Sequence, residues 1–306
     1  MAEAQGTIRR ATGLLVIEVI NSNPNGDPDR ESDPRIRPDE RGEISPVSFK
    51  RKVRDLIEDK DGPVWQALST QFSAPLDSAE FTILESRGRI RDEIIREIKE
   101  KRFLAKYWDA RVFGNTFLED RQGDNGSGAP STKLGSDHLR TGVVQFGLGI
   151  SIAPVRVERL TTTNKSGVQK DKDRGMAPLG YRVVEHGVYV MPFLVNPTAA
   201  RKTNCIARDI EVLLKVIPFA YSHTASYIRT AVEIRHAWYV EHKSPLGSAS
   251  DFDLIGALTP RKKSDPAQPS KAWGDYVVPE TLPEALAGRV APVRDLMAEA
   301  YAAASA

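Results

Sequence analysis

The chain has 306 residues, of which 40% are hydrophobic and 27% charged, so it holds enough apolar side chains for a sizeable folded core. Forty-three Lys and Arg against 41 Asp and Glu leave a formal charge of +2, which excludes a strong overall field for polyanions. One cysteine, Cys205, excludes an internal disulfide and indicates the cytoplasm, and no apolar run approaches the ~20 residues of a membrane span or suggests a signal peptide.

The first predicted element is a strand over residues 13–20. These residues are almost continuously apolar and rich in branched side chains, which is typical of a strand buried on both faces in the middle of a sheet. A polar loop follows to about Ser45, because Pro, Asn, Gly and Asp crowd residues 21–29 and favour turns.

Metal binding by this loop is weighed and set aside. Asn21, Asn23 and Asn25 match positions of a calcium loop, but Ser32 stands where such a loop needs a bidentate Glu. Three acids, Asp27, Asp29 and Asp33, could hold Mg²⁺ in principle, although acids in a proline-rich turn are usually solvated. A rigid turn that presents amide groups is the preferred interpretation, and a purely structural turn is the alternative.

A helix is predicted from Ser45, the expected N-cap, to about Lys60, with Pro46 at its first position. At 100° per residue, Lys50, Arg51 and Arg54 share one arc beside the buried face. Such an arc, with Ser45 and Ser48 nearby, is suited to bind phosphates. The alternative is an ordinary solvated face.

Residues 62–140 have the texture of a long insertion. A helix is predicted across Ile90 to Leu104, and the glycine-rich residues 123–128 suggest a mobile loop near the end of the insertion. Alternating strands are then predicted at 144–152, 181–195 and 232–240, with a helix between the last two that begins at Thr203 or Asn204 and ends at Pro218. The tail, residues 261–306, should end in an amphipathic helix from Pro292.

The order strand, helix, strand, strand, helix, strand predicts an α+β, ferredoxin-like (RRM-like) βαββαβ fold with its first and third strands central. The connection from Arg156 to Arg182 carries seven cations against three acids and should form a basic hairpin. Thr161 to Thr163 have strand character there, and Met176 could act as an apolar wedge. A charged surface loop is the alternative.

No catalytic constellation stands out, so the chain is predicted not to be an enzyme. It has no phosphate-binding Gly-x-x-x-x-Gly-Lys-Ser loop, no His-Glu-x-x-His pair and no complete dinucleotide fingerprint. The five histidines are better explained as packed or surface residues than as ligands or bases. We therefore expect no metal site and no cofactor.

Several phrases resemble the RNA-binding backbone subunit of type I CRISPR interference complexes (Cascade), and within it the type I-C and I-B branch. They lie in order between about residues 12 and 260, so chance is a poor explanation. The phrases are those at 19–29, 47–54, 107–114, 142–151, 160–163, 181–189, 226–229 and 242–247.

The resemblance implies a hand-shaped protein: a palm at 1–61 and 141–260, a helical finger insertion at 62–140, a thumb hairpin at 156–181 and a C-terminal tail at 261–306. Copies are expected to stack along one CRISPR RNA. Carried over by position, the resemblance favours these RNA contacts: Asn23, Asn25, Lys50, Arg51, Arg54, Thr162, Thr163, Lys165 and Met176. Ser45 and Ser48 join them from the helix argument.

The sequence therefore predicts a non-catalytic subunit that oligomerises along a guide RNA in the prokaryotic cytoplasm, with other Cascade subunits, and presents the guide for pairing with target DNA. The competing class is a metal-dependent ribonuclease of type III-like complexes, in which an aspartate of the 27–33 loop would cut target RNA. A third possibility is a sequence-specific single-stranded RNA-binding protein that works alone.

Overall fold

The structure is a computed structural model that describes residues 6–72, 76–115, 140–164 and 177–304. It combines helices with one large antiparallel sheet, whose strands follow the order β12-β9-β1-β8-β6-β2. Two further strands, β5 and β7, pair along the length of β8. The strands are β1 Ala11–Ser22, β2 Arg41–Ile44, β5 Val144–Phe146, β6 Gly149–Pro154, β7 Val157–Asn164, β8 Ala177–Val195, β9 Val232–Glu241 and β12 Arg294–Asp295.

Strand β1 lies at the centre of the sheet, between β8 and β9, and every residue from 11 to 19 is buried. Leu15 and Ile17 belong to the core on one face, whereas Leu14 and Val16 belong to the core on the other. Because neighbouring side chains of a strand point to opposite faces, only a sheet covered on both sides accepts this run. The predicted central position of the first strand is confirmed.

The expected strand at 144–152 forms as two pieces, β5 and β6, separated at Gly147 and Leu148. Both pieces pair with the 19-residue β8. A short strand, β2, lies inside the segment that was expected to be loop, and it pairs with β6. Gly42 allows β2 to form here, because any side chain at this position would collide with the Tyr189 ring of β8. This close approach of β2 to β8 depends on residues far apart in the chain, so local sequence patterns do not reveal it.

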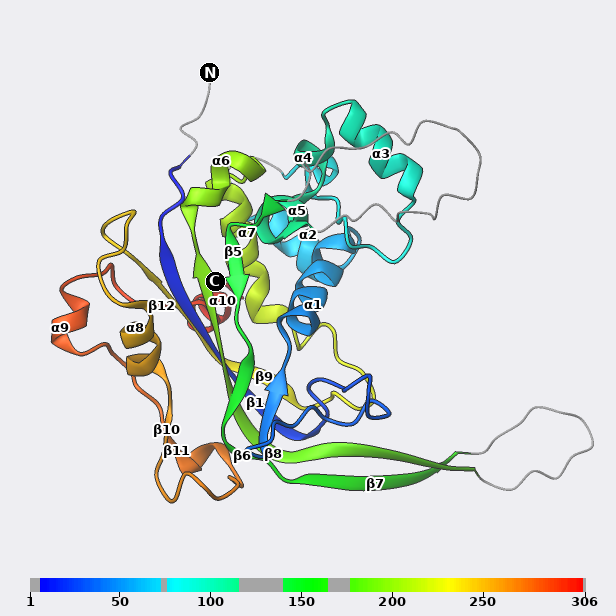
Figure 1. Ribbon diagram of the computed structural model, residues 1–306, viewed down its shortest axis with the longest axis vertical. Helices are drawn as coiled ribbons and strands as arrows, with labels where there is room; N and C mark the ends of the chain where they lie inside the picture. Colours follow the sequence, from blue (N-terminus) through cyan, green and yellow to red (C-terminus); the bar gives the residue numbers. More distant parts are fainter. Residues whose placement is uncertain (1–5, 73–75, 116–139, 165–176, 305–306) are drawn as a thin grey trace, which may run out of the picture.

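Two helices, α1 Pro46–Glu58 and α7 Ala207–Val216, pack on one face of the sheet (Figure 1). The predicted N-cap of α1 is confirmed, since Ser45 Oγ accepts from the Ser48 N–H at 3.2 Å. The expected start of α7 at Thr203 or Asn204 is wrong. Asn204 has a φ of 58° and ends the short helix α6 Ala200–Thr203, and the Asp209 carboxylate then caps α7 at the Ile206 N–H.

The insertion forms short helices: α2 Pro63–Ser69, η1 Ser78–Phe81, α3 Arg91–Lys99, α4 Phe103–Lys106 and α5 Trp108–Phe113. Helices α3 and α4, with one residue of α5, share a small separate core, whereas α2, η1 and the rest of α5 pack into the main core. The single helix predicted across Ile90 to Leu104 is two helices. Lys101, with a φ of 58°, separates them, and Ile90 stays 54% exposed. Strands β3 Gly114–Asn115 and β4 Arg140–Thr141 pair with each other. The glycine-rich residues 123–128 lie outside the described residues.

Two buried ion pairs attach the insertion to the helices of the sheet domain. Asp109 in α5 accepts from Arg54 Nε in α1 at 2.8 Å. Arg111, also in α5, donates to both carboxylate oxygens of Asp209 in α7, at 3.0 and 2.8 Å. All four side chains are at most 11% exposed. Breaking one partner of such a pair strands a buried charge, so these pairs fix how the insertion sits on the sheet domain.

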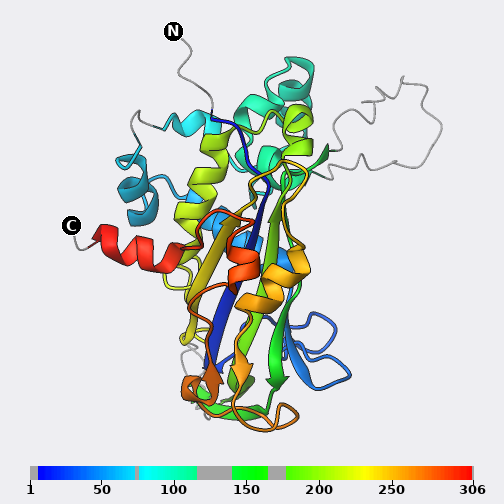
Figure 2. The same cartoon turned by 90° about the vertical axis from the view of Figure 1, so that its left-hand side faces the viewer.

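The C-terminal region covers the second face of the sheet. Helix α8 Asp251–Leu258 contributes Leu254 and Leu258 to a core with Leu14 and Trp238, and residues 276–290 complete it. Figure 2 shows this layer lying across the strands. Its other elements are β10 Arg261–Lys262, η5 Trp273–Asp275, β11 Tyr276–Val277 and α9 Glu284–Ala287. The last helix, expected from Pro292, begins later as α10 Leu296–Ala304, because Arg294 and Asp295 form strand β12.

Strands β7 and β8 form a long hairpin that projects from the lower end of the sheet (Figure 1). Their register runs from Val157 opposite Val184 to Asn164 opposite Ala177. Among the described side chains of β7, none beyond residue 157 belongs to either of the two large cores. Across the described residues, no helix is long and apolar enough to cross a membrane.

Candidate nucleic-acid interface

The loop after β1 is held rigid by its own asparagines. Asn23 is 1% exposed, and its Nδ2 donates to the Ser32 carbonyl at 2.7 Å. Asn25 is 7% exposed, and its Oδ1 accepts from the Ser45 N–H at 2.7 Å, which ties the loop to the start of α1. Their amides therefore shape the loop from inside. Direct contact of Asn23 and Asn25 with RNA stays a prediction.

The arginines of α1 already have partners within the chain. Arg51 donates to Asp55 Oδ1 at 2.7 Å, to Glu58 at 2.9 Å, and also to the Glu85 carbonyl. Arg54 is only 11% exposed beside Asp109. A phosphate would have to compete with carboxylates that are closer and preorganised. The structure thus divides the expected arc: two of its three cations join parts of the protein together.

Lys50 is the exception among the three. Its Nζ lies 5.2 Å from the centre of the Phe113 ring, and the described residues offer it no carboxylate. Burial lowers the pKa of the Lys50 ammonium, and the charge of Arg54 lowers it further. The cap residues Ser45 and Ser48 lie half-buried at the same end of the helix. Lys50 is therefore the cation of this helix best placed to accept a new anionic partner.

A fourth cation of α1, Lys52, was not singled out in the sequence, yet the structure buries it to 6% exposure. Its Nζ donates to Thr224 Oγ1 at 2.9 Å and lies 4.9 Å from the Tyr221 ring centre. Burial lowers the pKa of Lys52 to about 8, and the positive charge of Arg229 lowers it too. Lys52 connects α1 to the 221–229 loop. The same loop contacts the loop after β1, because Arg229 Nε donates to the Asn23 carbonyl at 3.0 Å.

A cleft of about 200 Å³ opens at the base of the hairpin, where β7 and β8 pass the loop after β1. Tyr181 lies beside Tyr227 with ring centres 5.5 Å apart, and Tyr227 is 65% exposed. Arg182 pairs with Asp33 across the cleft, whereas the described residues offer exposed Arg159 no carboxylate. The cleft is lined by Asn23, Glu31, Ser32, Asp33, Arg159, Gly180, Tyr181, Arg182 and Ile228.

Among the described residues, this cleft combines a guanidinium without a carboxylate partner, Arg159, with the Tyr181 ring, and the exposed Tyr227 ring lies beside Tyr181 at the edge of the cleft. Arginine binds phosphates through its fixed fork of donors, and bases stack on aromatic faces whatever their sequence. Both residue types come together here from β7, β8 and the 221–229 loop, which are far apart in the chain. The arrangement suits a single-stranded nucleic acid. The sequence analysis counted Arg159 only within a charge balance and gave Tyr227 no role.

Part of the expected hairpin surface lies outside the description. Thr162 and Thr163 belong to β7, opposite Leu179 and Pro178 of β8. Lys165 and Met176 lie outside the described residues. RNA contacts by these four residues stay predictions.

The acids of the loop after β1 are dispersed. Asp33 is engaged by Arg182, and Asp27 Oδ1 accepts from the Asp29 N–H at 3.1 Å. Within the described residues, no group of three His, Cys, Asp or Glu side chains is placed to hold a metal ion. Cys205 is buried, and burial raises the pKa of its thiol.

A family profile and a curated relative match this chain. The profile of the family described as "CRISPR-associated protein Cas7" matches residues 9–280, so nearly the whole chain is covered. The chain belongs to this family. A curated relative from Haloferax volcanii, "CRISPR-associated protein Cas7", is 26% identical over 215 residues, which are 68% of this chain and 62% of the relative. The chain thus matches less than two thirds of that relative's length.

Chains of CRISPR complexes are among the solved structures to which this chain is similar. A chain of a "CRISPR RNA-guided surveillance complex, pre-nicking" gives a TM-score of 0.46 at 12% identity, covering 76% of this chain and 78% of that one. A "CRISPR RNA-guided surveillance complex" gives 0.39 at 16%, covering 80% and 75%. A type III-B Cmr-beta complex bound to cognate target RNA gives 0.38 at 12%, covering 76% and 61%.

Proposed function

We propose that this protein binds CRISPR RNA as one of several stacked copies that form the backbone of a type I interference complex. Membership of the Cas7 family supports the assignment to a CRISPR complex. The observation that carries RNA binding is the cleft at the hairpin base, where the described residues give Arg159 no carboxylate and Tyr181 lies beside the exposed ring of Tyr227. Contacts to phosphates and ring faces suit a guide whose specificity comes from base pairing.

The domain assignment is part of this proposal. The strand order β9-β1-β8-β6, with α1 and α7 on one face, supports a ferredoxin-like palm. The helical insertion corresponds to a finger at 62–140, and the β7–β8 hairpin to a thumb at 156–181. In this assignment the tail at 261–306 acts as a cover for the second face of the palm, since Tyr276, Leu282 and Val290 lie buried in its core.

The first test asks whether the protein carries RNA. The protein is expressed together with a CRISPR array, purified, and its bound RNA is sized and sequenced. RNA of uniform length with a repeat-derived end supports the proposal. Protein that is free of RNA, or that carries random cellular fragments in the presence of the array, contradicts it.

The second test separates the backbone role from a nuclease role. The assembled complex is incubated with complementary RNA and Mg²⁺, and the RNA is examined for regular cuts. We expect the RNA to stay intact, because Asp33 is engaged by Arg182 and Asp27 turns onto its own loop. Cuts that vanish in a Asp27→Asn, Asp33→Asn variant would establish the type III-like alternative.

A further inference from the structure

A tight turn before α8 presents a large apolar side chain to solvent, and the first turn of α8 presents another. Leu246 is 89% exposed and Phe252 is 85% exposed, more than any other large hydrophobic residue in the described parts of the chain. We call residues 243–253 the knob. Single exposed apolar residues are common on proteins, but two at this exposure on one short segment indicate a contact surface.

The turn that carries Leu246 is rigid. The Gly247 N–H donates to the Ser244 carbonyl at 3.0 Å, and the Leu246 N–H donates to Ser244 Oγ at 3.2 Å. Gly247 has a φ of 99°, which an L side chain would resist. Leu246 is therefore held outward by the backbone and keeps little freedom to fold back.

A buried polar network supports the turn from beneath. The His242 side chain is 0% exposed, and its Nδ1 accepts from the Ser248 N–H at 3.0 Å. Its proton therefore lies on Nε2, which donates to Asp251 at 3.2 Å. Asp251 also accepts from Thr12 and Arg10, each at 2.5 Å. This network preorganises the knob, which lowers the entropy cost of docking it.

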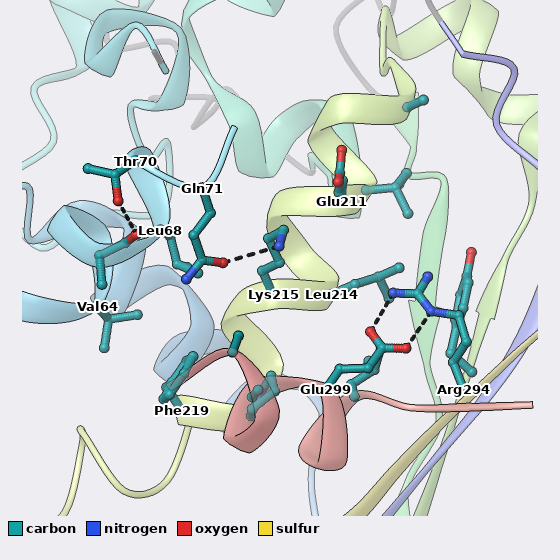
Figure 3. Close-up of a pocket in the computed structure, with 18 of the residues that line it drawn as sticks. Val64, Leu68, Thr70, Gln71, Glu211, Leu214, Lys215, Phe219, Arg294 and Glu299 are labelled. Carbon is teal, nitrogen blue, oxygen red and sulfur yellow. Dashed lines mark hydrogen bonds and ion pairs between the residues drawn. The ribbon is translucent and has the colours of Figure 1, made fainter. Parts of the chain in front are cut away.

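On a different side of the molecule, a groove of about 730 Å³ lies between α2, α7 and α10 (Figure 3). Its apolar lining includes Leu68, Leu214, Phe219 and Ala300. Figure 2 shows α8 facing the viewer, whereas α2 and α10 lie toward the left edge. A volume of ~300–1,000 Å³ is typical of sites that enclose a bound group. The groove has room for two large side chains and the turn between them.

The charges that flank the knob and the groove are complementary. On α7, the described residues give Glu211 no cation, and Lys215 bonds only the neutral Gln71 amide at 3.1 Å. On the knob, Asp253 has no cationic partner among the described residues, and Lys243 donates only to the Gly288 carbonyl at 2.8 Å. Each surface thus offers one cation and one anion without an opposite charge. Two such surfaces can pair both charges at once.

We propose that the knob of one copy of this protein docks in the groove of the next copy. This inference rests on the proposed stacking along RNA and names the contact that would join neighbours. Because the two surfaces differ and lie on different sides, the contact is head-to-tail, and a head-to-tail contact that does not close into a ring generates a helical array. A single chain supplies both surfaces, so every added copy exposes a new groove or knob.

Cysteine crosslinking tests the geometry directly, because the natural Cys205 is buried with a raised thiol pKa and gives little background. Protein carrying Leu246→Cys is mixed with protein carrying Ala300→Cys in the presence of RNA long enough for several copies. We expect a disulfide-linked pair that contains one of each variant. The matched control is exposed Ser264→Cys in place of Leu246→Cys. Equal crosslinking by the control, or none by the test pair, overturns the proposal.

Assembly supplies the second readout. Leu246→Asp with Phe252→Asp breaks the knob, and Ala300→Trp fills the groove. Each should raise the concentration for half-assembly on long RNA about tenfold, while binding to RNA short enough for one copy is unchanged. In a mixture of the two variants, the intact knob of the groove variant can still dock in the intact groove of the knob variant. No further copy can be added to such a pair, so assembly should stop at pairs. Normal long assemblies from either variant overturn the proposal.

These outcomes are separable from the proposed function. If wild-type protein binds no RNA of either length, the proposed function fails; if it assembles normally and the knob and groove variants do too, only the docking inference fails. A variant that self-assembles normally but loses another subunit of the complex would assign the knob to that subunit and overturn the inference. Circular dichroism and thermal melting of each variant exclude simple unfolding.

Discussion

Arg54 and Arg159 both belong to cationic stretches that the sequence assigns to RNA, yet they occupy opposite electrostatic settings. Arg54 is 11% exposed and bonds a carboxylate that is 1% exposed. Arg159 lies exposed at the cleft of the hairpin, with no carboxylate offered by the described residues. One cation joins two parts of the protein, and the other is free to join the protein to something else.

The difference shows that cations on one face of a helix form a binding surface only where no carboxylate of the same chain already pairs with them. The Asp109 that claims Arg54 comes from 55 residues away. Asp109 also accepts from the Leu84 N–H at 2.7 Å and the Glu85 N–H at 3.2 Å, so it is itself held in place. A helical wheel of α1 contains none of this.

The largest expected effect is on stability. Arg54→Met should lower the free energy of unfolding by about 3–5 kcal/mol, because it leaves the buried Asp109 carboxylate without its cation. Urea unfolding measures the loss. The double variant Arg54→Met, Asp109→Asn should recover part of it, since no charge is then stranded. A single variant as stable as the wild type would show that Arg54 is free after all.

The next effect is on RNA binding. Arg159→Gln should weaken binding to single-stranded RNA about fivefold to tenfold and reduce the slope of log affinity against log salt by about 1, with no change in unfolding. Fluorescence anisotropy at several salt concentrations measures both. Arg156→Gln is the matched control, because exposed Arg156 already lies 3.7 Å from Glu185. Equal losses in the two variants would contradict a special role for the cleft.

A smaller effect is expected for Arg51. Its partners Asp55 and Glu58 are 39% and 40% exposed, so Arg51→Gln should cost only about 0–1 kcal/mol of stability, and less at high salt. Its RNA affinity should change less than that of Lys50→Gln, which removes the cation without a carboxylate. A larger loss for Arg51→Gln than for Lys50→Gln would restore the original arc of three cations.

The last prediction is a pH dependence of stability. The pKa of Lys52 is about 8 in the folded protein and 10.5 as its ordinary value, so the unfolded chain holds more protons between these pH values. Stability from Lys52 should therefore rise as pH increases from about 8 to 10.5. Urea unfolding of the wild type and of Lys52→Met at pH 7.5, 8.5 and 9.5 measures the part of the pH dependence that Lys52 contributes. Lys60, whose pKa is also lowered to about 8, contributes equally to both proteins and cancels in the comparison. Parallel curves would contradict it.

Much of the fold was predictable because it depends on local patterns. The continuous apolar run at 13–20 predicted a central strand, and Ser45 followed by Pro46 predicted the start of α1. Boundaries were less predictable where tertiary contacts override them. Asn204 ends one helix through a left-handed φ, and β2 exists because Gly42 lets a strand pass the Tyr189 ring.

The candidate site was predictable only in part. The loop after β1 and the cationic hairpin were found, but Tyr227 was quoted within a similar phrase without a role. The phrase at 107–114 contained Asp109 and Arg111, whose opposite charges could have suggested ion pairs to other elements. Nothing in their spacing indicates which arginine or aspartate they meet, because those partners lie 55 and 98 residues away.

By itself, the sequence determined most of the long strands and helices, the burial of the first strand, and which stretches carry cations, because these properties follow from side-chain type and spacing along the chain. Only the tertiary structure decided which cations stay available. That decision depends on whether a distant carboxylate such as Asp109 arrives within hydrogen-bond distance, and long-range contacts of this kind leave no periodic trace in the residues on either side.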